Sequence, residues 1–472
     1  MQEGLSYGDV LLVPKLGIVE SRKDIDTTGR ITKGIAVKVP FVSVNMDTVT
    51  EHDMAIAMAR YGGLGIIHQF MTIEEQVEEV RLVKRATSHI IENPLCISPD
   101  LTLQELFTTY SRKYSFLVTD KDHKLVGILS NRDFLFETDF TKTIKELMTT
   151  KIISAPEDVT LVEAKQIFKK HKIEKLPLVD AQGHVKGLIT TKDILNKVRY
   201  PLASVDKKGR FLVAAAVGVK NGFLERTGKL IKAGADIICV DIAHGHSELA
   251  IRTVKAIKEA YPKTQILAGN VATGEGAKAL IEAGADGIKV GVGPGSACTT
   301  RIVAGTGVPQ ITALQNVSAV AKLYDVPIMA DGGIKTGGDI AKAIVAGAES
   351  MGAGSLFSAT AESPGRLIVK DGKRFKLYRG SASTAANIMR TKREGRSLDT
   401  TYTAEGIDTL KPFKGPVIEV FNELLGGFRS GLSYCGARTL KEAQENGEFI
   451  KITSAGMAES KAQFSSNGNG DL

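Results

Sequence analysis

The sequence predicts an α/β protein: a (β/α)₈ barrel interrupted by a smaller inserted module. Amphipathic stretches with helical spacing separate the later of its short apolar runs, and some, such as GFLERTGKLIKAGA and TGEGAKALIEAGA, close on Ala-Gly-Ala. The segment between the second and third runs breaks this rhythm and contains an internal repeat. The apolar runs, which end in Gly, Asp, Asn, His or similar small residues, are 41–47, 64–68, 211–218, 237–243, 266–272, 287–293, 327–333 and 350–356.

These eight runs are candidate strands of one parallel sheet. Strict alternation of strand and helix is typical of parallel sheets. Each run is apolar on both faces and carries its polar or Gly residues at the carboxyl end, which favours a closed barrel with the active site on that rim. A doubly wound open sheet is the alternative, and the number of runs argues against it.

The interruption contains two similar segments, KLVGILSNRDF at 124–134 and HVKGLITTKDI at 184–194. Gly127 and Gly187 are sixty residues apart, and so are Asp133 and Asp193. A strand-like run and an earlier helix precede each segment. We therefore expect two copies of one small α/β unit.

The expected domain boundaries follow from this repeat. The barrel is formed by residues 1–89 and 204–460, and the insert, 90–203, divides at about 145/146 into two copies. Residues 461–472 are polar and Gly-rich, and we predict that they are disordered.

Composition excludes several functional classes. Aromatic residues make up 6% of the chain and Trp is absent, so a basic stripe with interleaved aromatics for nucleic acid is not expected despite a net charge of +8. The four cysteines are scattered and suggest neither a zinc site nor disulfides, as in a reducing compartment. Without a signal-peptide pattern or an apolar run of about 18 residues, we expect a cytoplasmic protein that does not bind membranes.

The strand at 287–293 leads into the loop GPGSACTTR, which carries Cys298. Glycines let the backbone approach a ligand closely, and Ser296, Thr299, Thr300 and Arg301 supply donors around the thiol. An electropositive, partly exposed loop lowers the pKa of a thiol and makes a nucleophile. From these residues alone, a small buried Cys is the simpler interpretation.

Longer strings carry a resemblance to a known family. GPGSACTTR, with AGNVATGEGAKALIEAGADGIKVGVG before it and GTGVPQ after it, resembles the active-site loop of the IMP dehydrogenase and GMP reductase family. The similarity extends from LSYGDVLLVP and NMDTVTEHDMAIAMA through VDIAHGHS, MADGG and YRG to SAGMAES. The inserted repeat resembles paired CBS domains, which bind adenine or guanine nucleotides between the copies with Asp133 and Asp193 near a ribose; a nucleotide-free spacer or oligomer contact is the alternative.

The resemblance implies roles for individual residues. Cys298 adds to purine C2 to give a covalent intermediate, Asp331 holds the ribose hydroxyls, and a helix cap is the structural alternative for Asp331. The other residues expected to bind the purine nucleoside monophosphate are Ser296, Gly333, Gly354, Ser355, Tyr378, Gly380 and Ser381. Those expected to bind the nicotinamide cofactor, NADPH or NAD, are Asp241, Asn270, Gly291 and Gly293.

The resemblance also implies a monovalent cation, K⁺, and an oligomer. The carbonyls of Gly293, Gly295 and Cys298, with Glu459 of a neighbouring subunit, match the family's cation site. A homotetramer or octamer follows, because relatives complete this site and the cofactor pocket with a neighbouring subunit.

The direction of the reaction is predicted from the segment 390–408. Dehydrogenases of the family place an Arg-Tyr pair there to activate water, whereas in this chain Arg393 is followed by Glu394. Thr300 and Glu405 resemble the Thr and Glu that pass a proton to departing ammonia in the reductases. We therefore expect NADPH-dependent reduction of GMP to IMP.

Two alternatives stay open from the sequence. One is an NAD-dependent IMP dehydrogenase with an altered flap, in which Arg393 still activates water. The other is a catalytically inactive nucleotide sensor that acts through the CBS pair.

Overall fold

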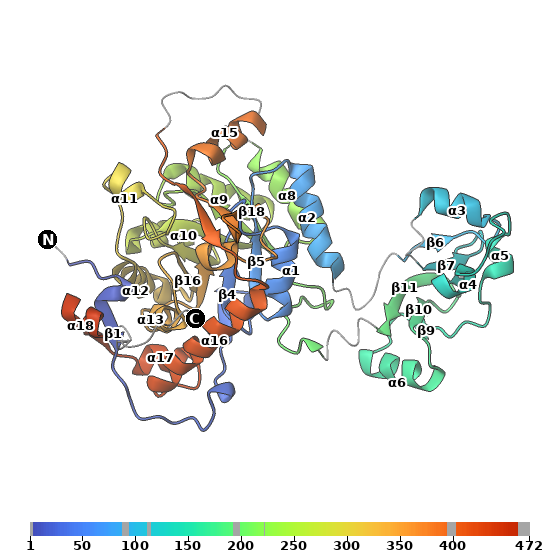
Figure 1. Ribbon diagram of the computed structural model, residues 1–472, viewed down its shortest axis with the longest axis horizontal. Coiled ribbons are helices and arrows are strands. Elements are labelled where there is room, and N and C mark those ends of the chain that lie inside the picture. Colours follow the sequence, from blue (N-terminus) through green and yellow to red (C-terminus); the bar gives the residue numbers. More distant parts are fainter. Residues whose placement is uncertain are drawn as a thin grey trace. The chain divides into compact units, whose positions relative to one another are not determined.

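The computed structural model describes residues 3–86, 94–110, 115–191, 199–220, 222–393 and 403–460. The chain divides into two compact units, shown in Figure 1. One comprises Met1–Lys84, Leu202–Asp206 and Phe211–Leu472, and the other Arg85–Pro201 with Lys207–Arg210. Among the helices in the described part of the chain, none is both long and apolar enough to cross a membrane.

The larger unit is a closed barrel of eight parallel strands, which confirms the predicted fold class and rejects the open sheet. Its order around the barrel is β12-β13-β14-β15-β16-β17-β4-β5. The bounds are β4 Phe41–Ser43, β5 Leu64–Ile67, β12 Ala214–Val217, β13 Ile237–Asp241, β14 Gln265–Val271, β15 Gly287–Val290, β16 Ile328–Asp331 and β17 Ser350–Ala353. Each strand lies within one of the apolar runs predicted from the sequence, allowing one residue at its start.

Helices alternate with the strands around the barrel (Figure 1). Some of them end beside a glycine: Gly234 follows the helix 223–233 with φ 103°, and Gly347 lies just beyond the helix 337–345 with φ 111°. Only glycine adopts such a left-handed conformation readily, so these residues stop the helices and turn the chain into the next strand. The main helices are α1 His52–Arg60, α2 Ile73–Ala86, α8 Phe223–Ala233, α9 Glu248–Ala260, α10 Gly274–Glu282, α12 Gln310–Ala321, α13 Gly337–Val345 and α16 Val417–Tyr434.

Additional elements surround the two ends of the barrel. One is an antiparallel sheet of β18 Leu367–Lys370, β19 Lys373–Arg379 and β20 Asp408–Pro412, which the sequence did not predict. Two small sheets pair β1 Val10–Leu12 with β21 Phe449–Lys451 and β2 Gly29–Thr32 with β3 Ile35–Val37. Short helices complete the unit: η1 Tyr7–Asp9, η2 Arg22–Asp24, η3 Lys322–Tyr324, α11 Thr300–Val303, α14 Ser355–Ser358, α15 Thr384–Arg393, α17 Leu440–Asn446 and α18 Ser454–Glu459.

The smaller unit consists of two halves with the same strand arrangement. In each half one strand runs parallel and another antiparallel to the central strand. Each half has its own apolar core. The elements are β6 Cys96–Ile97, α3 Leu103–Thr109, β7 Phe116–Thr119, β8 Leu125–Leu129, α4 Asn131–Phe134 and α5 Ile144–Leu147, then β9 Ala155–Pro156, α6 Leu161–His171, β10 Lys175–Val179 and β11 Val185–Thr190.

Phe41 shows how the barrel packs against its helices. Its side chain is fully buried, and its ring centroid lies 5.1 Å from that of Phe421 and 5.9 Å from that of Phe428 on α16. We expect Phe41→Ala to lower the free energy of unfolding by about 3–5 kcal/mol, because it leaves a cavity between β4 and α16. Urea unfolding measures this loss. Leu323→Ala, at a position that is 81% exposed, is the matched control and should change stability by less than about 0.5 kcal/mol.

Candidate active site

A cavity of about 950 Å³ opens at the carboxyl ends of the barrel strands. Residues at or just beyond the carboxyl ends of all eight strands line it, from Val44 after β4 to Leu356 after β17. The region around β19 and β20 completes the wall with Tyr378, Gly380, Ser381, Ala382, Thr403, Glu405, Gly406 and Lys411. This rim is where (β/α)₈ enzymes place their catalytic groups.

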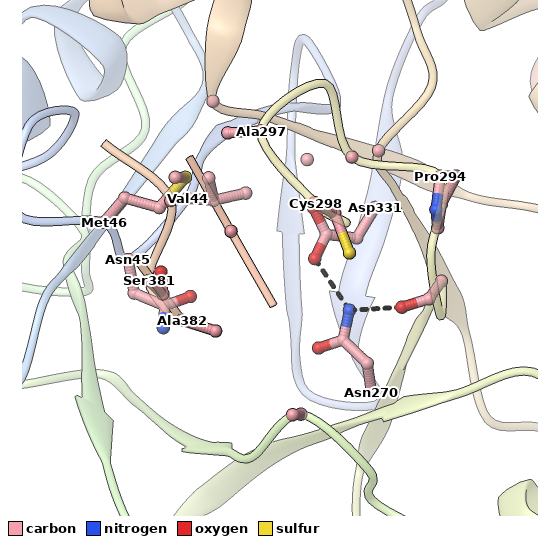
Figure 2. Close-up of a pocket in the computed structure, with 18 of the residues that line it drawn as sticks. Val44, Asn45, Met46, Asn270, Pro294, Ala297, Cys298, Asp331, Ser381 and Ala382 are labelled. Carbon is pink, nitrogen blue, oxygen red and sulfur yellow. Dashed lines mark hydrogen bonds between the residues drawn. The ribbon is translucent and has the colours of Figure 1, made fainter. Parts of the chain in front are cut away.

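Cys298 lies in this cavity on the loop between β15 and α11, half-buried (Figure 2). Its thiol lies 3.2 Å from the hydroxyl of Thr300, and its backbone N–H donates to the carbonyl of Gly295 at 3.0 Å. The expected neighbour Arg301 donates its guanidinium N–H to the carbonyl of Val308 at 2.9 Å.

The Cys298 loop is tied to the segment that carries Glu405. The N–H of Thr299 donates to the carbonyl of Glu405 at 2.9 Å, and the N–H of Ile407 donates to the carbonyl of Ala297 at 3.0 Å. These two bonds hold the segments side by side although they are far apart in sequence. As a result Cys298, Thr300 and Glu405 all line one cavity.

Asp331 ends β16 and lies in the cavity next to Asn270 (Figure 2). The amide of Asn270 donates to Asp331 Oδ2 at 2.8 Å and to the carbonyl of Gly291 at 2.9 Å. Gly291 is required here, because a Cβ atom at this residue would lie 2.1 Å from the carbonyl oxygen of Asp331. Asp331 is part of the cavity wall, and no capping bond from its side chain to the following helix is present among the described residues.

Tyr378 closes another part of the wall. Its side chain is buried, and its hydroxyl lies 3.8 Å from the sulfur of Met46. Burial raises the pKa of Tyr378, a hydrogen bond with Ser296 opposes this, and Asp331 and Cys298 raise it further. The phenol is therefore neutral at physiological pH and available as a hydrogen-bond donor. The remaining expected nucleotide-binding residues, Gly333, Gly354, Ser355, Gly380 and Ser381, line the same cavity.

The expected cofactor residues Asp241, Asn270, Gly291 and Gly293 also line the cavity. Beyond them, Gly218 and the aromatic ring of Phe70 belong to its wall. A Cβ atom at Gly218 would lie 2.7 Å from the side-chain oxygen of Gln69, so a larger residue here would displace the Gln69 side chain, which also lines the cavity. The volume and the mixed polar and aromatic wall suit a second ligand beside a nucleotide.

Some expected site residues lie elsewhere or outside the described residues. Glu459 ends α18, is exposed and does not line this cavity. Arg393 ends α15, but its side chain is outside the described part of the structure, as are Glu394, Asp193 and the tail 461–472. Asp133 is described: its carboxylate accepts bonds from the N–H and hydroxyl of Ser130 at 2.6 and 2.7 Å and so caps α4.

Comparison with known protein families identifies the family. The family model described as the IMP dehydrogenase / GMP reductase domain matches residues 4–463 of this sequence. The chain belongs to this family.

Its relatives include both activities. The chain is 52% identical to inosine-5'-monophosphate dehydrogenase of Nitrosopumilus maritimus, over 98% of each protein, and 44% identical to GMP reductase of Leishmania donovani, over 98% of this chain and 96% of the relative. A cysteine-to-alanine variant of Trypanosoma brucei GMP reductase, solved with guanosine 5'-monophosphate, superposes with a TM-score of 0.93 at 41% identity and 99% coverage of both chains. The protein is thus an oxidoreductase of a family that binds purine nucleotides and uses a nicotinamide cofactor.

Lys289 is the main cavity-lining residue that the sequence analysis did not predict. Its side chain is 5% exposed and lines the cavity from β15. Its ammonium lies 3.1 Å from Asp241, 3.1 Å from Asp331 and 3.2 Å from Asn45. The available signal was a lysine inside the apolar run GIKV, since a buried cation needs carboxylate partners.

Proposed function

We propose that the protein is a GMP reductase, which converts GMP to IMP and ammonia with NADPH. The observation that carries this proposal is the shared position of Cys298, Thr300 and Glu405 in one cavity. Ammonia release needs a proton donor near the nucleophile, and a carboxyl group can both give and take a proton.

The residues have distinct roles in this reaction. The sulfur of Cys298 adds to C2 of GMP, and the bond from C2 to the amino group breaks when the amine leaves as ammonia. Glu405 supplies the proton for the amine and Thr300, whose hydroxyl contacts the Cys298 sulfur, relays it. NADPH, when bound, supplies hydride to C2, after which the C2–S bond breaks and IMP is released.

The remaining wall of the cavity would orient the two ligands. Asp331 accepts hydrogen bonds from the ribose hydroxyls of GMP, and Tyr378 and Ser296 donate to its phosphate with the backbone at Gly333, Gly354, Ser355, Gly380 and Ser381. Asp241, Asn270, Gly291 and Gly293 hold the cofactor.

A monovalent cation and an oligomer belong to the same proposal. Gly293, Gly295 and Cys298 lie on one tight loop, in which the carbonyl of Gly295 accepts one bond at 3.0 Å and keeps a second lone pair for an ion. We infer K⁺ at these carbonyls, completed by Glu459 of a neighbouring subunit in a homotetramer or octamer.

The similar architecture of its two halves supports assigning the smaller unit as a CBS pair. We infer that it binds an adenine or guanine nucleotide near Asp133 and Asp193. The carboxylate of Asp133 already caps α4, so the ribose would compete for, or share, its oxygens.

IMP dehydrogenase is the second candidate, favoured by the 52% identity to the N. maritimus protein. It would oxidise IMP with NAD and hydrolyse the covalent intermediate with water activated by Arg393. The sequence Arg393-Glu394 argues against it, because Glu stands where the dehydrogenases have Tyr and a carboxylate near a guanidinium favours its charged form, which is a poor base.

Absorbance at the nicotinamide band separates the two candidates. The purified protein is offered GMP with NADPH in one cuvette and IMP with NAD in another, both with potassium. Loss of absorbance with GMP alone is the expected result. A sustained increase with IMP alone would overturn the reductase proposal in favour of the dehydrogenase.

A further inference from the structure

Lys289 is a buried lysine in the wall of the cavity. Its side chain projects from the middle of a barrel strand and is 5% exposed. An ammonium group has three N–H donors, and three oxygens surround this one: Asp241 Oδ1 and Asp331 Oδ2 at 3.1 Å each, and Asn45 Oδ1 at 3.2 Å. The hydrogen-bonding capacity of Lys289 is thus used within the protein, and none of its donors is left for a ligand.

The two carboxylates that Lys289 joins each keep one oxygen for a ligand. Lys289 contacts Oδ1 of Asp241 and Oδ2 of Asp331, and the other oxygen of each carboxylate accepts no hydrogen bond from the described residues. Both carboxylates line the cavity. A single buried ammonium therefore lies behind two carboxylates, on β13 and β16, that face ligand space.

Charge balance explains why such an arrangement needs the lysine. Burial acts to lower the pKa of Lys289, but Asp331 and Asp241 outweigh it, so the pKa is raised and the ammonium stays charged. Cys239 also faces Lys289, and burial raises the pKa of this thiol to about 12, so it brings no charge at neutral pH. Without the ammonium, the two partly buried carboxylates would repel each other across the cavity wall.

We propose that Lys289 is a positioning residue that holds Asp331 and Asp241 at the correct spacing, so that one binds the substrate ribose and the other the cofactor. This inference rests on the proposed function, because that proposal assigns the two ligands to the two carboxylates. Lys289 therefore supports the binding of both ligands. Removing Lys289 alone lowers the affinity for both of them. Removing Lys289 together with one carboxylate leaves unchanged the affinity for the ligand that the other carboxylate binds.

Two charge-matched double variants test this directly. Equilibrium dialysis with GMP measures nucleotide affinity, and NADPH fluorescence measures cofactor affinity. K289M/D241N should bind GMP within a few-fold of wild type and lose NADPH affinity, whereas K289M/D331N should do the opposite. K289M alone should lower the affinity for each ligand by at least about 30-fold, since it leaves two carboxylates in the cavity wall without their cation.

Lys84 provides the matched control. Its side chain on α2 is also 5% exposed and pairs with Asp206 at 3.2 Å and Asp236 at 2.6 Å, but it does not line the cavity. K84M should destabilise the fold, as K289M does, without changing either affinity.

The possible outcomes are distinguishable. The inference would be overturned, and the proposed function left standing, if each double variant lost affinity for GMP and NADPH equally. Wild-type affinities for both ligands in K289M would have the same meaning. Failure of the wild-type protein to bind either GMP or IMP would overturn the proposed function, and the inference with it. If K289M does not fold, the two double variants, which carry no excess charge, still decide the question.

Discussion

Cys298→Ala is expected to lower GMP reduction by at least about 10⁴-fold, because the variant cannot form the bond to C2. Binding should survive, since the loop keeps its backbone bonds from Ala297 and Thr299 to residues 405–407. Steady-state turnover and equilibrium dialysis with GMP measure the two quantities separately. Affinity for GMP within a few-fold of wild type, with turnover lost, is the predicted combination.

Cys96→Ala is the control, because Cys96 belongs to the smaller unit and does not line the cavity. Iodoacetamide adds a second measurement. Burial raises the pKa of the thiols of Cys96, Cys239 and Cys435, which lowers their thiolate fraction at neutral pH. Labelling should therefore fall mainly on Cys298 and be blocked by GMP. Full activity of Cys298→Ala would contradict the covalent mechanism, and an absence of labelling at Cys298 would favour the nucleotide sensor.

The barrel could be predicted because its signals are local and periodic. Each strand is a short apolar run closed by small or polar residues, and the intervening helices are amphipathic, several of them ending beside a glycine such as Gly234. The sequence did not predict the sheet β18-β19-β20, because its strands lack this pattern. Its strands lie outside the barrel and nearly all of their residues are exposed or only partly buried, so their side chains do not follow the apolar pattern that identifies buried strands.

The site was predicted in part. Cys298, Thr300 and Asp331 follow strands or lie in a glycine-rich loop, where sequence position already indicates the active rim. The role of Lys289 could not be read from its position in the chain. Its partner Asp241 is 48 residues away, and only the closed barrel brings the two side chains to 3.1 Å. Contacts of this kind depend on the tertiary fold.

Glu405→Gln is expected to lower the turnover of GMP by about 10²–10⁴-fold, the usual contribution of a general acid or base. Glutamine keeps the size of the side chain but cannot supply a proton to the departing amine. The backbone should be unaffected, because its bonds are to the carbonyl of Ala382 and the N–H of Thr299. Glu445→Gln, at an exposed position that does not line the cavity, is the control.

A partial reaction isolates the step that Glu405 serves. When IMP and NADP⁺ are mixed with enzyme in stoichiometric amounts, Cys298 can add to C2 and hydride can leave C2 without any amine to protonate. A single burst of nicotinamide absorbance should therefore persist in Glu405→Gln while the turnover of GMP is lost. Equal loss of the burst and of turnover would show that Glu405 supports the Cys298 loop as a whole. Loss of turnover alone would assign it to ammonia release, the step that a reductase has and a dehydrogenase lacks.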